Sequence, residues 1–279
     1  MNTSIKYVAS SGHYYDLTVK GTLHRTANYY DWKWNVEGTQ LQYGTRVSNF
    51  LREAAEYDAE LVFYGEPETI KATISALHND FEYDLRQNKP GRIILGKYHI
   101  DCFINQSGTD PFPTWKYVSN KIHIYAPYPF WVSDYNVTLP KAAASGSTFL
   151  DYPYDYPYDY TAPAVGIKKI KLDSPFSSEF RMVIYGQAVN PRITINGHPY
   201  VLYVTIPSGA YVIVDSRSKS IMQYNRDGTR SNMFNFRNKT DSIFEKVPGG
   251  NLLITWDSSF GVDLTIYQER SEPDFEVIA

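Results

Sequence analysis

Alternating apolar and polar positions recur along most of the chain and predict a protein built mainly of β-strands. In the first half, several short segments carry β-branched and aromatic side chains between polar, turn-forming stretches. These strand candidates are residues 5–9, 29–36, 60–64, 92–95, 98–105 and 115–125. Together they indicate a β-sandwich or partial barrel in the first half.

One segment of the first half instead repeats at helical spacing. Its apolar side chains recur every three or four residues, which places them on one face of an α-helix. They are Ile70, Ile74, Leu77, Phe81 and Leu85. Pro67 suits the first turn, and Pro90-Gly91 marks the end. Residues 47–55 repeat in a similar but shorter way, through Val47, Phe50, Leu51 and Ala54, so a short helical turn is expected there.

The second half is expected to be almost purely β. Short strand patterns follow one another without any segment of helix length. They cover residues 168–172, 179–185, 192–195, 200–206, 210–215, 220–224, 251–256 and 262–267. Asn196-Gly197 and Asp227-Gly228 are strong hairpin dipeptides, because these residue types tolerate positive φ. This spacing predicts a β-sandwich or jelly roll.

A tyrosine–proline repeat lies between the two halves. Residues 151–160 read Asp-Tyr-Pro-Tyr-Asp-Tyr-Pro-Tyr-Asp-Tyr and follow a run of small residues at 141–148. Proline lacks an amide donor and holds the preceding residue extended, so a helix is excluded and a central strand is disfavoured. The chain of 279 residues is therefore expected to form an N-terminal domain (residues 1–135), a linker (136–165) and a C-terminal domain (166–279).

Composition narrows the classes of partner. The net charge is −3, which gives no reason to expect a broad nucleic-acid surface or binding to anionic membranes. A single cysteine, Cys102, excludes an intrachain disulfide and a cysteine-based zinc cluster. No stretch has the length and apolarity of a membrane-spanning helix, and the N-terminal residues lack a signal-peptide apolar region, so a soluble product made in the cytoplasm is expected.

Catalytic motifs are missing from the sequence. None of the six histidines has metal-ligand spacing, and there is no nucleophile elbow, P-loop or dinucleotide-binding glycine motif. We therefore expect no enzyme activity, no catalytic residue, no cofactor and no metal. A thiol site at Cys102 is disfavoured because His99 and Asp101 fall on the opposite face of the predicted strand. A glycosidase remains a minor alternative, with Glu245 and Asp257, or Asp257 and Asp263, as its carboxylate pair.

Aromatic side chains offer contact surfaces, since aromatics make up 16% of the residues. We expect a first group to pack between domains or subunits, namely Phe130, Trp131, Tyr152, Tyr154, Tyr156, Tyr158 and Tyr160. Tyr211 and Trp256 are candidates for stacking on sugars, although filling the core is the simpler role for them. The alternative function is accordingly a carbohydrate-binding module that attaches to cell-surface glycans.

An ordered series of short motifs is similar to one known family. The series contains residues 88–93 (Asn-Lys-Pro-Gly-Arg-Ile), 96–104 (Gly-Lys-Tyr-His-Ile-Asp-Cys-Phe-Ile), 129–131 (Pro-Phe-Trp), 190–197 (Asn-Pro-Arg-Ile-Thr-Ile-Asn-Gly), 209–215 (Gly-Ala-Tyr-Val-Ile-Val-Asp), 248–251 (Pro-Gly-Gly-Asn) and 267–273 (Tyr-Gln-Glu-Arg-Ser-Glu-Pro). Over nearly the whole chain this order resembles the distal tail proteins of long-tailed, non-contractile bacteriophages. Each motif is short, and only their order is specific.

The resemblance implies an architecture and a set of partners. It implies an N-terminal domain that forms a homohexameric ring and a C-terminal galectin-like or jelly-roll sandwich that projects outward. The ring would join the tail tube protein to a tail-associated hub or lysin protein, and the outer domain would hold a receptor-binding protein. Such a chain acts at the virion tail tip, after assembly in the bacterial cytoplasm, without binding specific nucleic acid or a membrane.

Overall fold

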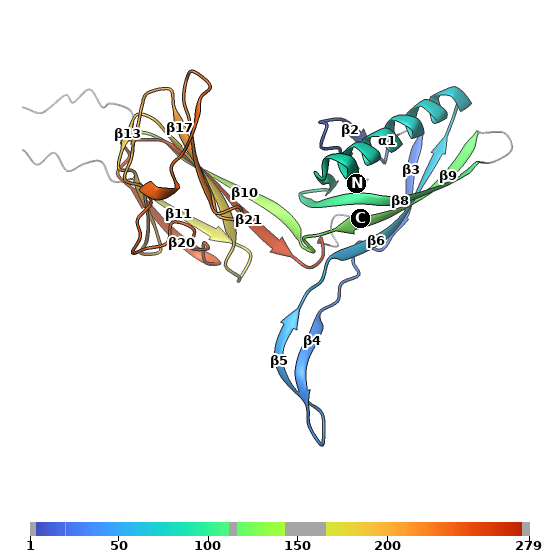
Figure 1. The fold of residues 1–279 in the computed structure, drawn as a ribbon, viewed down its shortest axis with the longest axis horizontal. Coiled ribbons are helices and arrows are strands. Elements are labelled where there is room, and N and C mark those ends of the chain that lie inside the picture. Colours follow the sequence, from blue (N-terminus) through green and yellow to red (C-terminus); the bar gives the residue numbers. More distant parts are fainter. Residues whose placement is uncertain (1–3, 20, 112–115, 143–165, 275–279) are drawn as a thin grey trace, which may run out of the picture. The chain divides into compact units, whose positions relative to one another are not determined.

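The computed structural model describes residues 4–19, 21–111, 116–142 and 166–274 (Figure 1). The tyrosine repeat at 151–160 lies outside these residues. The chain divides into two compact units, of which unit 1 contains residues 1–133 and 269–279 and unit 2 contains residues 134–268. The chain passes from unit 1 to unit 2 within strand β10 (Trp131–Leu139) and returns within β21 (Val262–Arg270). Unit 1 is therefore built from both ends of the sequence.

The strands of unit 1 form a curved antiparallel arrangement around one long strand. β8 (Tyr98–Pro111) pairs through its first residues with β7 (Gly91–Leu95), and the order continues to β1 (Ile5–Val8) and β2 (Tyr14–Asp16). From Phe103 onward β8 pairs instead with β9 (Tyr117–Ala126), followed by β6 (Ala55–Tyr64) and β3 (Thr22–Ala27). Among the described residues, β2 and β3 each pair on one side only.

The single α-helix covers the inner side of these strands. α1 (Pro67–Gln87) buries Ile70, Ile74, Leu77 and Phe81 in the core of unit 1, as the periodicity predicts. The last turn differs, because Asp84 is fully buried whereas Leu85 is 43% exposed. Both positions continue the three-and-four spacing from Phe81, and Asp84 lies inside because it is hydrogen-bonded there. The expectation that Leu85 lies on the apolar stripe was wrong.

A separate two-stranded ribbon projects from unit 1. It consists of β4 (Asn35–Gln40) and β5 (Thr45–Leu51), which pair only with each other among the described residues (Figure 1). The helical turn expected at residues 47–55 is wrong, since this segment contains most of β5 and the beginning of β6. A β-bulge explains the misleading spacing. The register shifts between Glu37 and Gly38, so Val47 and Phe50 share one face although they are three residues apart.

Unit 2 is a two-layer β-sandwich. One layer has the order β19 (Arg230–Asn232), β18 (Ser220–Tyr224), β17 (Tyr211–Asp215), β12 (Glu179–Tyr185) and β21, followed by the residues of β10 from Asp134 onward. The other has the order β11 (Gly166–Leu172), β20 (Gly250–Trp256), β14 (Arg192–Ile195) and β15 (His198–Val201). Three short elements complete the unit, β13 (Ala188–Val189), β16 (Thr205–Ile206) and the 3₁₀ turn Phe234–Phe236.

The core of unit 2 lies between its layers and contains side chains from both, such as Met182, Val212, Ile193 and Ile254. Asn196 and Gly197 have φ of 46° and 88° and form the β14–β15 turn, as their dipeptide predicts. The prediction of a mainly β protein with one flanking helix is thus confirmed.

Candidate assembly surface

The projecting ribbon has one apolar face and one polar face. Val36 lies opposite Phe50, and Gly38 lies opposite Val47, so these residues share a face. The other face carries Glu37 opposite Asn49 and Thr39 opposite Arg46. Gly38 is required beside the bulge, since a Cβ there would lie 2.5 Å from the Arg46 carbonyl oxygen. The ribbon is therefore amphipathic without a core beneath it.

The apolar face of the ribbon is open to solvent. Val36, Val47 and Phe50 are 54%, 47% and 56% exposed. An isolated two-stranded ribbon is marginally stable in water, and clustered exposed apolar side chains mark a contact surface. These three residues are referred to below as the ribbon face.

The tip of the ribbon also presents large side chains. The turn between β4 and β5 is closed by a hydrogen bond from the Leu41 amide to the Gly44 carbonyl oxygen, 2.9 Å long, with Gly44 at φ 82°. Within this turn Leu41 is 50% exposed and Tyr43 is 87% exposed. A solvent turn is usually polar, so a leucine and a tyrosine in this position indicate a binding element.

Arg52 fixes the base of the ribbon to the body of unit 1. Its guanidinium lies 4.6 Å from the centroid of the Phe130 ring and 5.7 Å from that of Trp34. It also donates hydrogen bonds to the hydroxyl and the carbonyl oxygen of Ser271, at 2.5 and 3.2 Å. Burial lowers the pKa of this guanidinium, although a group with so high an ordinary pKa stays charged at neutral pH. Arg52 thus links the residues that follow β5 to Phe130 and to Ser271.

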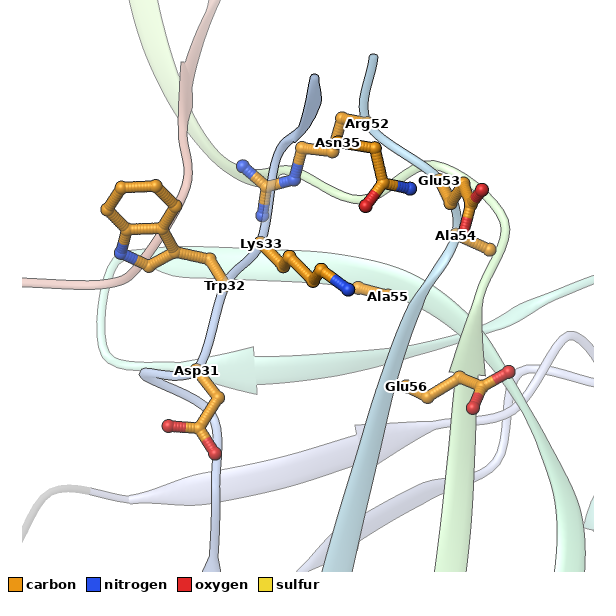
Figure 2. Close-up of a pocket in the computed structure, with 9 residues that line it drawn as sticks. All are labelled: Asp31, Trp32, Lys33, Asn35, Arg52, Glu53, Ala54, Ala55 and Glu56. Carbon is orange, nitrogen blue, oxygen red and sulfur yellow. The ribbon is translucent and has the colours of Figure 1, made fainter. Parts of the chain in front are cut away.

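A pocket of about 250 Å³ opens beside this base (Figure 2). Its walls are the segment that enters β4, residues 31–35, and the segment that leaves β5, residues 52–56. It contains cations, Lys33 and Arg52, together with anions such as Asp31 and Glu56. These charged side chains make the pocket a polar contact surface.

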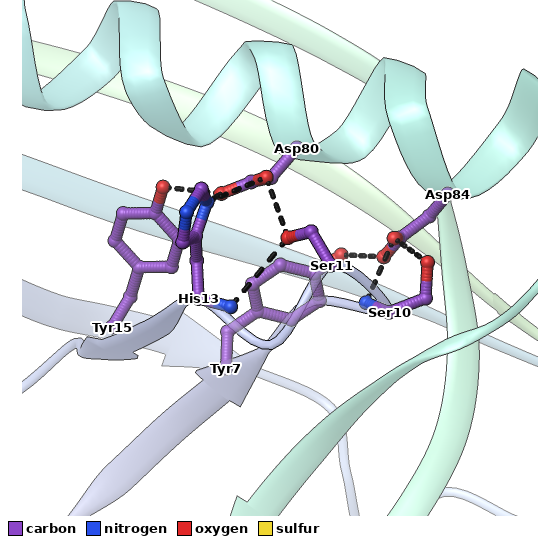
Figure 3. A network of polar contacts seen from close by, with 7 residues as sticks. All are labelled: Tyr7, Ser10, Ser11, His13, Tyr15, Asp80 and Asp84. Carbon is purple, nitrogen blue, oxygen red and sulfur yellow. Dashed lines mark hydrogen bonds and ion pairs between the residues drawn. The ribbon is translucent and has the colours of Figure 1, made fainter.

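A polar network fastens the β1–β2 turn to α1 (Figure 3). The buried Asp84 carboxylate accepts hydrogen bonds from the Tyr7 hydroxyl (2.5 Å), the Ser10 amide (2.9 Å) and the Ser10 hydroxyl (2.6 Å). One turn earlier, Asp80 accepts bonds from Tyr15 and Ser11 and pairs with His13 at 2.9 Å. The network holds the β2 side of unit 1 rigidly against the helix.

Hydrogen-bond donors keep the Asp80 carboxyl group acidic in spite of its burial. Burial by itself raises the pKa of Asp80, but hydrogen bonds from Tyr15, Ser11 and His13 outweigh burial and hold that pKa below its ordinary value. Burial and the adjacent Asp84 carboxylate raise the pKa of the Tyr7 hydroxyl, which therefore stays protonated and donates. The cluster is a structural clasp between acceptors and donors.

The aromatic residues singled out from the sequence lie in different places. Trp131 is fully buried in the core of unit 1, with ring centroids 5.5 and 6.2 Å from Tyr29 and Tyr57. Phe130 is half-buried under Arg52. Trp256 is 7% exposed in the core of unit 2, and the half-buried Tyr211 stacks on Tyr224 at 5.1 Å. Tyr152, Tyr154, Tyr156, Tyr158 and Tyr160 lie outside the described residues.

The residues considered from the sequence for a thiol site or a glycosidase lie in ordinary structural surroundings. Cys102 is completely buried, and burial raises the pKa of its thiol. Asp257 accepts bonds from the amide and hydroxyl of Ser259 within its own turn, and Asp263 accepts one from Tyr185. The backbone carbonyl oxygen of Glu245 accepts a bond from Tyr200, and this bond does not involve the Glu245 carboxylate. Across the described ranges, no cluster of three or more histidine, cysteine, aspartate or glutamate side chains is placed to hold a metal ion.

Sequence reasoning did not find the ribbon face, the tip or Arg52. The available signal was the Gln-Tyr-Gly sequence at 42–44 between the two short segments that pair as β4 and β5. No helix in the described part of the chain has the length and apolarity needed to cross a bilayer.

Comparison with known proteins identifies structural relatives but no sequence relatives. No protein-family model matches the sequence, and no curated protein matches it. The structure resembles the Dit (gp 19.1) protein of phage SPP1, which is described as a paradigm of the hub adsorption apparatus in phages infecting Gram-positive bacteria. The TM-score is 0.61 and the sequence identity 7%, and the match covers 95% of this chain and 99% of that one.

A second resemblance is to a chain of the phage P2 baseplate in its activated conformation with Ca. The TM-score is 0.63 and the identity 13%, over 98% of this chain and 100% of that one. A chain of the same baseplate with Sr matches with a TM-score of 0.62. At these identities the comparisons establish a common fold along nearly the whole chain.

Proposed function

We propose that this chain is a structural protein of a bacteriophage or prophage tail tip, of the distal tail class found in long-tailed, non-contractile phages. The fold shared with the phage Dit and baseplate chains over nearly full length supports this role. The observation that carries it is the exposed amphipathic ribbon, because such an element needs a protein partner to bury its apolar face.

The assembly we propose is a homohexameric ring closed by head-to-tail contacts between unit 1 domains. A heterologous contact joins two different surfaces of the same protein, and it generates a ring when the rotation closes. Unit 1 offers such surfaces in the ribbon and in strand edges that pair on one side only among the described residues, namely β3 and the part of β8 after Phe103. The number six comes from the resemblance to distal tail proteins.

The proposed partners follow from that place in a virion. The ring joins the tail tube protein on one side to a tail-associated hub or lysin protein on the other, and unit 2 is the attachment point for a receptor-binding protein. A sandwich with its own core suits such an anchor, since unit 2 keeps its fold without support from the ring.

The test is a substitution on the ribbon face. Phe50→Asp places a charge in the proposed contact and should abolish rings, whereas Asn49→Asp adds the same charge on the opposite face of the same strand and should leave them intact. Mass photometry and negative-stain microscopy of the full chain, alone and with its tail tube and hub proteins, measure the outcome. Rings that form equally well with Phe50→Asp, or a wild-type chain that stays monomeric under all these conditions, would refute the proposal.

A further inference from the structure

Figure 1 shows β2, β3 and α1 on the side of unit 1 opposite the ribbon tip. These elements surround a groove with an apolar floor. Its volume is about 520 Å³, and it opens between β2 and β3 over the first turns of α1. The buried side chains of Phe63, Ile70 and Leu77 form its floor. Tyr14 and Val19 stand at its rim, 54% and 50% exposed.

This groove exists because two strand edges do not meet. β2 pairs only with β1, and β3 pairs only with β6, among the described residues. The Asp80–Asp84 clasp holds β2 against the helix, and β3 is held by β6, so the gap is a fixed feature of the fold. Backbone groups along two free edges and an apolar floor together suit a segment of β-structure as the occupant.

We propose that this groove receives the ribbon tip of a neighbouring copy of the same chain, with Leu41 and Tyr43 as its anchors. The inference rests on the proposed ring and names the surface that receives the ribbon. Within one molecule the tip and the groove lie at opposite ends of unit 1, so the contact requires a second copy (Figure 1). Tip and groove are different surfaces, which is the arrangement of a head-to-tail contact.

Charge supports the choice of a second copy as the occupant. Among the described residues, the charged side chains that line the groove are Asp16 and Glu66, both acidic. The charged residue nearest the tip is Arg46, one pair away from the last pair of the ribbon. Arg46 is exposed, and Glu66 precedes the first turn of α1 with its side chain exposed. A tip seated in the groove brings the exposed Arg46 cation toward the exposed Glu66 anion.

The anchors match the floor in chemistry. A leucine and a tyrosine are the kind of side chain that dominates binding when it fills a desolvated pocket, and Tyr43 is almost entirely exposed in the free chain. Burial of both side chains against Phe63, Ile70 and Leu77 removes apolar surface from water on each partner. The polar residue between them, Gln42, is also exposed and serves as a comparison position.

Cysteine cross-linking tests the contact directly, because the single native cysteine is completely buried. One full-length chain carries Tyr43→Cys, and a second carries Thr69→Cys, an exposed groove position on the first turn of α1. The matched control is Ser75→Cys, which is exposed on the same helix outside the groove lining. The mixed proteins are oxidised under ring-forming conditions and separated on non-reducing gels.

The expected result is a disulfide-linked dimer of one Tyr43→Cys chain and one Thr69→Cys chain. This dimer should form at least about tenfold faster than the dimer of Tyr43→Cys and Ser75→Cys chains. Rings without this product would overturn the groove assignment and leave the proposed function standing. Monomers throughout, without cross-links, would overturn both. A cross-link between two Tyr43→Cys chains at the same rate would also overturn it, because it indicates tip-to-tip contact.

Affinity gives a second readout. Tyr43→Ala should raise the subunit dissociation constant about 30-fold, the effect of removing a binding hot spot, whereas Gln42→Ala should change it less than about threefold. Arg46→Glu should also weaken assembly, and Glu66→Arg in the same chain should restore it. Equal effects of Tyr43→Ala and Gln42→Ala, or no restoration by the charge exchange, would contradict the groove assignment.

Discussion

Asp84→Ala should destabilise unit 1 more than any other single change in the clasp. The substitution removes the acceptor of three hydrogen bonds. The Tyr7 hydroxyl then lies in a side chain that is 2% exposed, and the Ser10 amide also loses its acceptor. The Ser10 hydroxyl can turn toward solvent, so it adds little.

The magnitude follows from the two donors left unpaired. A donor that loses a charged partner costs about 1–3 kcal/mol, and the cost is greatest where the donor is fully buried. The buried Tyr7 hydroxyl and the partly buried Ser10 amide together give a loss of about 4 kcal/mol in the free energy of unfolding of unit 1. Tyr7→Phe removes one donor and leaves the carboxylate with two bonds, so its cost should be nearer 1.5 kcal/mol.

Hydrogen exchange measured by mass spectrometry suits a chain with two units, since it reports on each separately. A loss of about 4 kcal/mol corresponds to roughly a thousandfold faster exchange in the most protected amides of α1 and β1. The amides of β12 and β17 in unit 2 serve as the internal control. Their exchange should not change.

The double variant tests whether stranded donors cause the loss. In the Asp84→Ala background, Tyr7→Phe removes a hydroxyl that no longer has a partner. It should therefore cost less than it does in the wild type, or even restore stability. Additive losses, or an Asp84→Ala effect below about 1 kcal/mol, would refute the assignment of Asp84 as the centre of the clasp.

Two further predictions concern the same region. Gly91→Ala places a Cβ 2.5 Å from the Asp84 carboxylate and 2.6 Å from the Tyr7 hydroxyl. It should lower the free energy of unfolding by about 2 kcal/mol, measured by thermal or urea unfolding. The control, Gly108→Ala, has open space around its Cβ and should be nearly neutral. The pKa of Asp80 is lower in the folded chain than its unfolded value near 3.8. Its bonds therefore stabilise unit 1 fully at pH values above 3.8, and this stabilisation is lost as the pH falls through the folded-state pKa. The free energy of unfolding, measured with urea, should therefore fall less steeply with decreasing pH below about pH 4 in Asp80→Asn than in the wild type. Equal pH dependence of the two proteins would contradict this.

The sequence predicts the elements that fill a core. Ile70, Ile74, Leu77 and Phe81 could be placed on one helix face because a core demands an apolar stripe, and the paired strands of unit 2 follow from alternation and turn dipeptides. The burial of Asp84 in place of Leu85 at the end of the helix could not be predicted, because the groups that donate hydrogen bonds to Asp84 come from residues more than 70 positions away.

The candidate site was harder to predict for a physical reason. The ribbon has no core of its own to impose strict alternation, and its bulge brings Val47 and Phe50 together at a spacing that also fits a helix. Leu41 and Tyr43 give no sign of their exposure in the sequence, whereas in the structure they are 50% and 87% exposed. Exposure is a property of the folded chain, and periodicity alone does not contain it.

Unit 1 has a consequence for the order of events during synthesis, because unit 2 is inserted within it. Arg52 is held by Ser271, and the buried Tyr98 donates a hydrogen bond to Asp274, so residues from the first half of unit 1 wait for residues 271–274 to leave the ribosome. Unit 2 is contiguous and meets no such delay. We therefore expect nascent chains to complete the sandwich of unit 2 first and unit 1 last, which keeps the base of the ribbon unsupported until residues 271–274 have been made.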